Sequence, residues 1–248
     1  QAGCRILEVY DAGFSVEEKG DRTPLTEADL AAHDAVDHGL HRLTPDLPVL
    51  SEESADVPFE IRRRWQRYWL VDPLDGTREF IRRSGEFAVN IALIDGGTPI
   101  LGVVYAPVLG LCYFACSGHG AYRQEALDLP EPIHTRRGVT GQVVVAGSRS
   151  HKGEAIKAFL AKIGNFRLLP CGSALKACLV ASGEADVYPR LGPTSEWDTA
   201  AAQCIVEEAG GRITDTAMRP LQYNTKPSLL NPHFFAAGDP EVDWSRYL

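Results

Sequence analysis

Two carboxylates, Asp72 and Asp75, are the side chains of this sequence best placed to do chemistry. They follow the apolar run of residues 68–71, which predicts a buried strand, and they bracket Pro73, which cannot extend a central strand. Because Gly76 permits a tight turn immediately afterwards, we expect both acids at a strand end. Two carboxylates held close together repel each other unless a cation lies between them. The pattern therefore indicates a cation site, although an ordinary solvated turn uses the same residue types.

The neighbouring residues favour the cation site over the solvated turn. Thr77 follows the acidic pair, and Glu52-Glu53 lies upstream, after the apolar stretch 48–50. We therefore expect Glu52 at a second strand terminus. Hard oxygen ligands, with no nearby cysteine or histidine to complete a set, favour Mg²⁺ over zinc.

Three separated motifs of the chain resemble those of the inositol monophosphatase superfamily. Residues 69–77 match its D-P-[IL]-D-G-T signature, residues 51–54 match its upstream G/S-E-E motif, and residues 196–201 match its downstream W-D-x-A-A motif. The motifs occur in the family's order, and the similarity spans nearly the whole chain. Within the superfamily the chain is most similar to the bacterial 3'(2'),5'-bisphosphate nucleotidases. The segments whose amino-acid sequence carries this similarity are residues 67–80, 87–93, 101–107 and 172–176.

The resemblance implies more metal ligands than the first acidic pair. They are the carboxylates of Glu52, Asp72, Asp75 and Asp198 and the main-chain carbonyl of Leu74. Two or more Mg²⁺ ions are implied, enough to hold both the attacking water and the leaving oxygen of a phosphate ester. From local sequence alone, Asp198 could equally cap a helix before residues 199–201.

The resemblance also places a Thr–Asp pair beside the attacking water. This pair corresponds to Thr77 and Asp29, and Glu52 also contacts the water. We expect direct attack of water on phosphorus, with no histidine or cysteine acting as a covalent nucleophile. The alternative for Asp29 is a cap or first-turn acid that complements a helix dipole.

Substrate contacts are implied in both halves of the chain, at Leu74, Asp75, Gly76, Thr77, His151, Ser173, Lys176, Arg190 and Asp198. Three of these have structural alternatives: Ser173 as a helix N-cap, Lys176 as an exposed helix lysine, and His151 as a surface residue. Arg190 follows a predicted strand, where a guanidinium could hold a second phosphate bidentately. Ala174 departs from the family, which usually has a second serine there, so one substrate hydroxyl contact has no counterpart.

Two different patterns predict the elements that position these residues. In the first half, residues 6–16 have helical spacing, and a second helix opens with Thr26 or Asp29 as its N-cap. Strands are predicted at 47–50 and 68–71. A β-rich passage follows over residues 87–114, broken by a hairpin signal at 95–97. The first half is therefore predicted to be helices on an antiparallel sheet.

From residue 142 onward, strands alternate with helices, which predicts helices packed on a sheet. The strands are predicted at 143–146, 166–169 and 185–188, and the helices at 151–163, 173–181 and 198–209. We place residues 1–138 in an α+β half with the antiparallel sheet and most metal ligands. Residues 139–248 then form an α/β half with the substrate-recognition residues. The resemblance implies a sugar-phosphatase-like sandwich of alternating α/β/α/β/α layers, with the active site between the halves.

The composition of the chain limits the kinds of partner that it can bind. It has 248 residues, 44% hydrophobic and 23% charged, the profile of a soluble globular protein. A net charge of −8 argues against nucleic-acid binding, which usually needs a basic face, but is compatible with a small phosphorylated substrate. No apolar run is long enough to span a membrane, and no signal peptide is visible. The six cysteines lack C-x-x-C spacing and predict buried free thiols in a reducing cytoplasm.

The implied activity is a Mg²⁺-dependent phosphatase that removes the 3'-phosphate of adenosine 3',5'-bisphosphate, giving AMP and phosphate, with inhibition by lithium. The resemblance implies a cytoplasmic location, and the family's bacterial members are sometimes assigned to the cytoplasmic face of the inner membrane, so a weak peripheral membrane association stays open here, as does the oligomeric state. Two alternative functions stay open: the same chemistry on inositol monophosphate or a sugar bisphosphate, and a non-catalytic, metal-dependent nucleotide-binding module. The set Asp29, Glu52 and Thr77 speaks against the binding module, which has no need of a water-activating pair.

Three further patterns are interpreted as structural. Residues 62–67 are rich in arginine and resemble a nucleic-acid patch, but we expect a solvated surface there. His38 and His41 lack the glutamate of a zinc-protease motif and are expected on the surface. Residues 118–120, Gly-His-Gly, are expected to form a turn.

Overall fold

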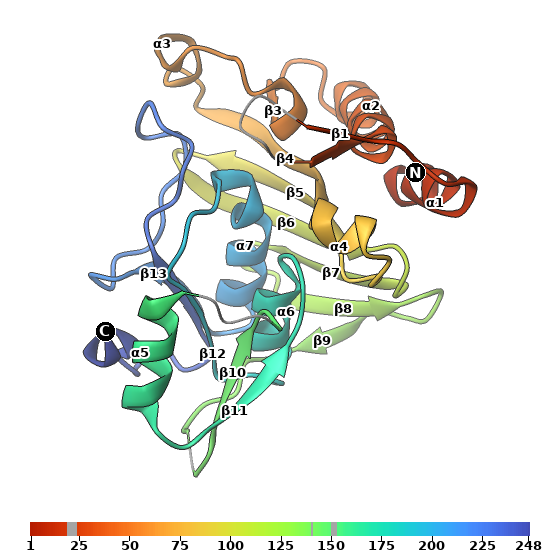
Figure 1. The fold of residues 1–248 in the computed structure, drawn as a ribbon. Coiled ribbons are helices and arrows are strands. Elements are labelled where there is room, and N and C mark those ends of the chain that lie inside the picture. Colours follow the sequence, from red (N-terminus) through yellow and green to blue (C-terminus); the bar gives the residue numbers. More distant parts are fainter. Residues whose placement is uncertain (19–23, 140, 150–152) are drawn as a thin grey trace.

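The computed structural model describes residues 1–18, 24–139, 141–149 and 153–248, and within them the strands form two large sheets (Figure 1). The seven-stranded sheet has the order β3-β4-β5-β6-β7-β8-β9, and the five-stranded sheet has the order β11-β10-β12-β14-β13. A short ribbon joins β1 (Val16–Glu18) to β2 (Pro24–Thr26). No described helix is long and apolar enough to cross a membrane.

The seven-stranded sheet is antiparallel except at one edge, where β3 and β4 run parallel. The predicted hairpin at residues 95–97 is confirmed, with Gly96 and Gly97 both at positive φ between β5 and β6. The strands are β3 (Val49–Ser51), β4 (Arg67–Asp75), β5 (Ala88–Asp95), β6 (Thr98–Ala106), β7 (Leu111–Cys116), β8 (Ala121–Glu125) and β9 (Glu131–Ile133).

The five-stranded sheet follows the predicted alternation of strands and helices. Its strand β10 pairs in parallel with β11 and β12, whereas β14 is antiparallel to β12 and β13. The strands are β10 (Val143–Gly147), β11 (Phe166–Pro170), β12 (Val187–Arg190), β13 (Arg212–Asp215) and β14 (Phe234–Ala237).

Helices occupy three layers around and between these sheets. α1 (Ala2–Ala12) and α2 (Glu27–Leu43) cover the seven-stranded sheet, α6 (Leu175–Ala181) and α7 (Ala200–Glu208) lie between the sheets, and α5 (Glu154–Ile163) packs on the five-stranded sheet with the 3₁₀ turn η3 (Trp244–Tyr247). The predicted α/β/α/β/α order is confirmed. Four short elements complete the chain: η1 (Glu52–Ser54), α3 (Phe59–Arg62), α4 (Thr77–Ile81) and η2 (Glu196–Asp198).

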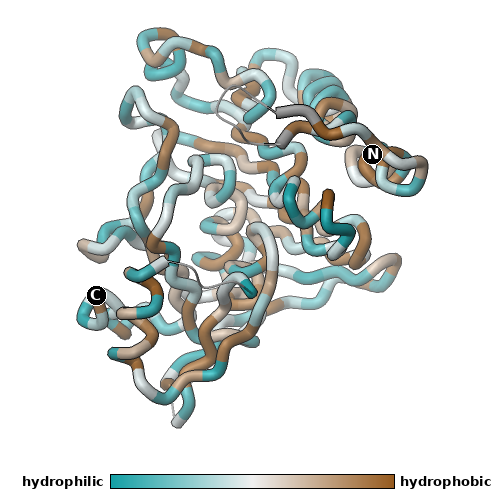
Figure 2. The backbone as a smooth tube through the Cα atoms, viewed as in Figure 1, coloured by the Kyte–Doolittle hydropathy of each residue, from teal (hydrophilic) through white to brown (hydrophobic). Residues whose placement is uncertain are grey.

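The apolar core follows the same layers. The largest cluster of buried apolar side chains contains residues of both sheets, such as Leu70 and Phe234, together with α6 and α7. Figure 2 shows hydrophobic stretches along the strands of both sheets. The sheets occupy residues 49–133 and 143–237, and the division that we place at 138/139 falls between them. Because the two halves share one core, their relative position is held by packing. The division itself stays a prediction.

Close packing of α7 on β6 positions the downstream motif. A Cβ atom at Gly102 would lie 2.2 Å from the carbonyl oxygen of Ala201, so β6 and the first turn of α7 approach more closely than any larger residue allows. Asp198 immediately precedes α7, and this contact therefore fixes its height above the large sheet.

The largest departure from the predicted elements concerns Pro73. We expect the strand to end before this proline, but β4 continues through Pro73 to Asp75. The register with β5 shifts between Asp72 and Asp75, and β3 pairs with β4 only as far as Val71. The proline therefore lies in a bulge, beyond the end of the neighbouring strand, where no ladder hydrogen bond is required of it.

Other boundaries differ by a few residues. α1 ends at Ala12, and Gly13 follows it with a φ of 89°, so the predicted helix over 6–16 is too long. α6 begins at Leu175 rather than at residue 173, because Ser173 has a φ of 47°, which is not helical. α7 begins at Ala200, with the separate turn η2 before it.

The arginine-rich patch is only partly a solvated surface. Arg62 is 2% exposed, and its guanidinium donates hydrogen bonds to Asn224 Oδ1 and to the carbonyl of Pro227, both at 2.5 Å. The expectation is therefore wrong for Arg62, which anchors a distant loop, whereas Arg63 and Arg67 are exposed.

The remaining structural interpretations hold, with one correction on the thiols. His38 and His41 are exposed, and Gly118 and Gly120 form a turn whose two N–H groups donate to the carboxylate of Glu208. All six cysteines, each within the described part of the chain, are free thiols. Burial is correct only for Cys178 and Cys204, because the others are partly or fully exposed.

Candidate metal centre

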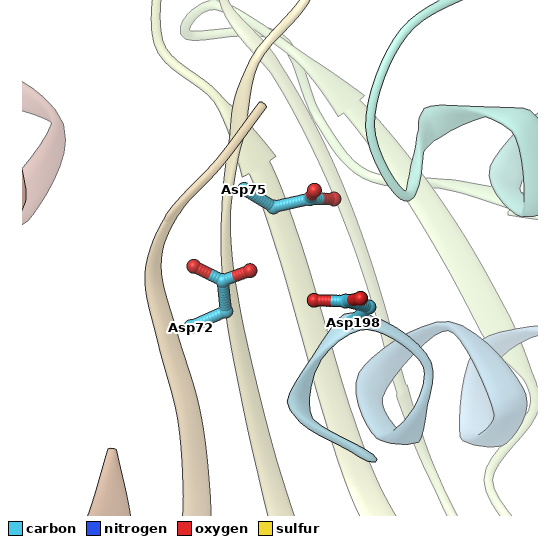
Figure 3. Close-up of side chains that lie close together, drawn as sticks. All are labelled: Asp72, Asp75 and Asp198. Carbon is cyan, nitrogen blue, oxygen red and sulfur yellow. The ribbon is translucent and has the colours of Figure 1, made fainter. Parts of the chain in front are cut away.

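Three carboxylates from the two halves of the chain meet between the sheets. Asp72, Asp75 and Asp198 each offer an oxygen, and these oxygens all lie within 4.8 Å of one another. In Figure 3 the first two project from the end of β4 and the third from η2, toward a common space. The acids predicted at a strand terminus are therefore joined by one that lies more than a hundred positions away in sequence.

Local hydrogen bonds hold the first two carboxylates. Asp72 is 1% exposed, and its Oδ1 accepts the N–H of Leu74 at 3.0 Å, a turn that the bulge makes possible. Asp75 Oδ2 accepts the N–H of Ala174 at 2.5 Å and lies 3.4 Å from Asn90 Nδ2. Asp75 thereby connects the two halves directly.

Asp198 combines capping with a position in the cluster. Its Oδ2 accepts the N–H of Ser195 at 2.8 Å, as the third residue of a capping box that opens η2. The N-cap of α7 is Thr199, so the predicted alternative, Asp198 as the cap of that helix, is wrong. Because a carboxylate has two oxygens, this cap is compatible with metal ligation.

Burial and mutual repulsion raise the pKa of all three acids. For Asp72, burial is the largest cause, followed by the charges of Glu52, Asp75 and Asp198. Burial raises the pKa of Asp75, against the lowering effect of Lys176. Burial and the charge of Asp75 raise the pKa of Asp198 to about 7. Such a group is costly when ionised without a counter-charge.

Glu52 and Leu74 border this cluster. Glu52 lies in η1, is half-buried, and is the acid whose charge raises the pKa of Asp72 most. Among the residues that the structure describes, the group of three carboxylates does not include it. Leu74 is buried, and its carbonyl oxygen lies 3.4 Å from Thr77 Oγ1. The ligand roles of both residues stay predictions.

Thr77 and Asp29 form a hydrogen-bonded pair beside the cluster. Thr77 Oγ1 donates to Asp29 Oδ1 at 3.3 Å, although 48 positions separate the two residues. Asp29 is 2% exposed, and its Oδ2 accepts both the N–H and the hydroxyl of Thr26, at 2.7 and 2.6 Å. Thr26 is therefore the N-cap of α2, and Asp29 is the first-turn acid of its capping box, whose other oxygen accepts from Thr77.

A cavity of about 540 Å³ opens from the carboxylates toward the C-terminal half. It is wide enough for a nucleotide-sized ligand. Its walls include most of the predicted substrate residues: Asp75, Gly76, Ser173, Lys176, Arg190 and Asp198. His151 lies outside the described residues. Gly76, at a φ of 95°, opens α4 at the edge of this cavity.

The basic residues of the C-terminal wall are held in place by the protein. Lys176 is only 7% exposed, and its Nζ donates to the carbonyl of Ser173 at 2.6 Å and lies 5.3 Å from the ring centre of Tyr188. The alternative of an ordinary exposed lysine is therefore wrong. Arg190 ends β12, and its Nη2 donates to the carbonyl of Pro193 at 2.8 Å. Ser173 lies in the turn before α6, whose N-cap is Ala174, and Ser173 Oγ accepts the N–H of Leu175 at 3.4 Å.

Comparison with known proteins agrees with this geometry. The sequence model of the inositol monophosphatase family matches residues 1–239. This chain belongs to the inositol monophosphatase family. The protein named 3'(2'),5'-bisphosphate nucleotidase CysQ from Escherichia coli K12 is 50% identical over 236 residues, which cover 94% of each chain. The protein of the same name from Aggregatibacter actinomycetemcomitans is 40% identical over 248 residues, covering 99% of this chain and 92% of the relative.

A solved structure supports the same assignment. The crystal structure of CysQ from Bacteroides thetaiotaomicron, described as a bacterial member of the family, superposes with a TM-score of 0.83 at 39% identity. The match covers 96% of this chain and 93% of that one. The chain is accordingly an enzyme, a phosphatase of the inositol monophosphatase family, whose members are metal-dependent.

The donor set of this phosphatase fits Mg²⁺. The three clustered groups offer hard carboxylate oxygens, and none of the described residues adds a cysteine or histidine to the cluster. Asp72 is buried, and its pKa is raised mainly by burial and by the charges of Glu52, Asp75 and Asp198. A divalent cation would compensate this repulsion, and Asp72, Asp75 and Asp198 would hold it.

The raised pKa values predict how stability depends on pH. A folded-state pKa above the unfolded value means that the unfolded chain releases protons first, so stability falls as pH rises from roughly 4 toward about 7. In EDTA, we expect Asp198→Asn to gain in Tm relative to the wild type across this window, since asparagine does not ionise. Saturating Mg²⁺ should stabilise the wild type and reverse the difference. Parallel Tm profiles in EDTA would contradict the prediction.

Sequence reasoning misses four residues of this site. Asn90 contacts Asp75 from β5, and Arg78, Arg82 and Arg149 line the cavity. The only sequence signal is the spacing of Arg78 and Arg82, which places both on one face of a helix directly after the acidic motif.

Proposed function

We propose that this phosphatase hydrolyses the 3'-phosphate of adenosine 3',5'-bisphosphate to give AMP and phosphate, with two or more Mg²⁺ ions. The observation that carries the proposal is the adjacency of an acidic metal centre and a cavity lined with basic residues from both halves of the chain. A bisphosphate substrate needs the acidic metal centre for hydrolysis of one phosphate and the basic lining of the cavity for recognition of the other. The relatives named 3'(2'),5'-bisphosphate nucleotidase support this substrate.

When bound, Mg²⁺ supplies positive charge for the phosphoryl oxygens and lowers the pKa of water. The carboxylates of Asp72, Asp75 and Asp198, with Glu52 and the carbonyl of Leu74, would hold the ions. Water then attacks phosphorus, the bond to the 3'-oxygen breaks, and the ribose hydroxyl leaves with a proton.

Thr77 and Asp29 orient the attacking water in this proposal. The single hydroxyl proton of Thr77 is directed at Asp29 Oδ1 or at the carbonyl of Leu74. The lone pairs of Thr77 Oγ1 are then free to accept a hydrogen bond from water. Asp29, itself held by two hydrogen bonds from Thr26, supplies the negative charge that favours removal of the proton.

Recognition is assigned to the C-terminal wall of the cavity. Lys176 presents a positive charge there, Arg190 ends a strand that faces the metal centre, and Ser173 and Gly76 border the entry to the carboxylates. His151 stays a predicted contact. Lithium inhibition and a cytoplasmic location stay predictions as well.

Phosphate release from three substrates tests the proposal. With Mg²⁺ present, we expect kcat/KM for adenosine 3',5'-bisphosphate to exceed that for inositol 1-phosphate and fructose 1,6-bisphosphate by at least about a hundred-fold, since each unmatched charged contact costs roughly 1.5–3 kcal/mol. A preference for the inositol or sugar substrate would refute the proposed substrate, adenosine 3',5'-bisphosphate. Tight binding of the bisphosphate without turnover under saturating Mg²⁺ would refute the proposed hydrolysis of this substrate.

A further inference from the structure

Glu196 is a fully buried acid on the turn that carries Asp198. It is 0% exposed and is the first residue of η2, whereas Asp198 is the last. A 3₁₀ helix has three residues per turn, so side chains two positions apart point in directions about 120° apart. Asp198 accordingly joins the group of three carboxylates, and Glu196 contacts the segment that connects β13 and β14.

Both carboxylate oxygens of Glu196 are held by this segment. Its Oε2 accepts the N–H of Asn224 at 2.7 Å, and its Oε1 accepts from Lys226 Nζ at 3.2 Å. The main chain contributes as well, because the N–H of Glu196 donates to the carbonyl of Leu229 at 2.8 Å. A buried carboxylate is tolerated when hydrogen bonds and a cation pair it in this way. The segment is therefore fastened to η2 through both main chain and side chain.

The connecting segment, residues 216–233, is itself anchored by α3. It is irregular apart from isolated bridges at Pro220 and Leu230, and Figure 1 shows it extending from the five-stranded sheet toward α3. Asn224 Oδ1 accepts from Arg62 Nη1 at 2.5 Å, and Asn224 Nδ2 donates to the carbonyl of Arg62 at 2.6 Å. Asn224 has a φ of 58°, a left-handed conformation that asparagine adopts more readily than most residues. A continuous hydrogen-bonded path thus leads from α3 to η2.

Two sets of contacts define where Asp198 lies. The packing of α7 on β6 fixes its height above the large sheet, and the contacts of Glu196 act on the turn from another side. From this geometry we infer that Glu196 is a positioning residue for Asp198, which fixes the orientation of η2 through Asn224 and Arg62. Mg²⁺ requires nearly ideal octahedral geometry, with oxygen ligands at about 2.0–2.1 Å, so a small rotation of η2 weakens the metal centre. Glu196 does not line the cavity and acts only through Asp198.

This inference rests on the proposed function, because it requires that Asp198 holds Mg²⁺. Thermal unfolding at increasing Mg²⁺ concentration tests it without turnover, since an ion that binds only the folded state raises Tm once its concentration exceeds its Kd. We expect Glu196→Gln to need about ten-fold more Mg²⁺ than the wild type for the same increase in Tm over its own value in EDTA, a loss typical of residues that orient metal ligands. A purely structural role would lower Tm in EDTA and leave this Mg²⁺ requirement unchanged.

The fold should survive this substitution. Glutamine has the size of glutamate, and its oxygen can still accept the N–H of Asn224. Lys226 loses its ionic partner, but its side chain is 40% exposed and can be hydrated. The change therefore loosens the contact between η2 and the segment without opening a cavity.

The double variant Glu196→Gln/Asp198→Asn shows whether Glu196 acts through Asp198. Asp198→Asn by itself removes one of the proposed ligands and should raise the Mg²⁺ requirement. If Glu196 only positions that ligand, adding Glu196→Gln should change the requirement by no more than about two-fold further. Multiplied losses would mean that Glu196 acts independently of Asp198 and would overturn the inference, as would a wild-type Mg²⁺ requirement in Glu196→Gln alone.

Two further variants complete the experiment. Asn224→Gly removes the side-chain bonds to Arg62 without changing a buried charge, and glycine adopts the left-handed conformation without strain. It should raise the Mg²⁺ requirement as Glu196→Gln does, and an unchanged requirement would contradict the path through α3. Glu208→Gln is the matched control. Glu208 ends α7 and also accepts two main-chain N–H groups, but those of the turn at residues 118–120, so this variant should need no more Mg²⁺ than the wild type.

Failure of this inference differs from failure of the proposed function. If Mg²⁺ stabilises the wild type but the bisphosphate is not hydrolysed, the proposed function fails, and the comparison of the variants still tests the role of Glu196. If the bisphosphate is hydrolysed and Glu196→Gln needs no more Mg²⁺ than the wild type, only the positioning role fails. If Mg²⁺ does not stabilise the wild type, both fail.

Discussion

Replacing Asp72 with asparagine should abolish turnover while leaving the fold intact. Asparagine keeps the shape of the side chain, and its oxygen can still accept the N–H of Leu74, so the bulge in β4 should persist. The charge that faces Glu52, Asp75 and Asp198 is lost, and with it a buried ligand. Loss of an indirect metal contact already costs roughly 10–100-fold, so we expect kcat/KM to fall by about a thousand-fold or more.

Thermal unfolding distinguishes this effect from general damage. In EDTA, the asparagine variant should be at least as stable as the wild type, because it removes a raised-pKa acid from a repulsive group. The rise in Tm on adding Mg²⁺ should be strongly reduced. Asp128→Asn, in the exposed turn between β8 and β9, is the matched control and should retain both activity and the response to Mg²⁺. Near-normal turnover by the Asp72 variant would refute the metal centre.

The parts of the site that the sequence predicts are those made by local interactions. The capping box of Thr26 and Asp29 and the turn of Asp72 join residues two or three positions apart, and their spacing is visible in the sequence. The contact between Asp198 and the β4 acids depends on how α7 packs against β6. Residue spacing carries no information about that packing, and only the family resemblance predicts this contact.

Burial of charged side chains is the part that could not be predicted. Arg62 and Lys176 look like surface residues in the sequence, but both are buried. Their burial is tolerated because main-chain carbonyl groups accept their hydrogen bonds. For Arg62 this carbonyl belongs to Pro227, far away in the chain, and for Lys176 to the nearby Ser173. A partner such as Asn224, 162 positions from Arg62, leaves no local signal. Pro73 shows the same limit, since its place in a strand depends on where the neighbouring β3 ends.

Thr77→Val should lower kcat by about a hundred-fold or more, because it removes the hydroxyl that orients the attacking water. The effect should be confined to turnover. Valine has nearly the volume of threonine, and Thr77 is not among the proposed metal ligands, so the increase of Tm with Mg²⁺ should resemble that of the wild type. Thr77→Ser keeps the hydroxyl and should restore most of the activity, which separates the role of the oxygen from that of the methyl group.

Asp29→Asn tests whether Thr77 acts through its partner. The asparagine oxygen can still accept both hydrogen bonds from Thr26, but the negative charge that complements the N-terminus of α2 is lost, so this variant should lose up to about 1 kcal/mol of stability in addition to activity. If the two side chains act as one unit, the double variant Asp29→Asn/Thr77→Val should be no slower than the worse of the two single variants. Multiplicative losses of kcat would mean that Asp29 and Thr77 act independently, and the 3.3 Å hydrogen bond between them would then have no part in activating water.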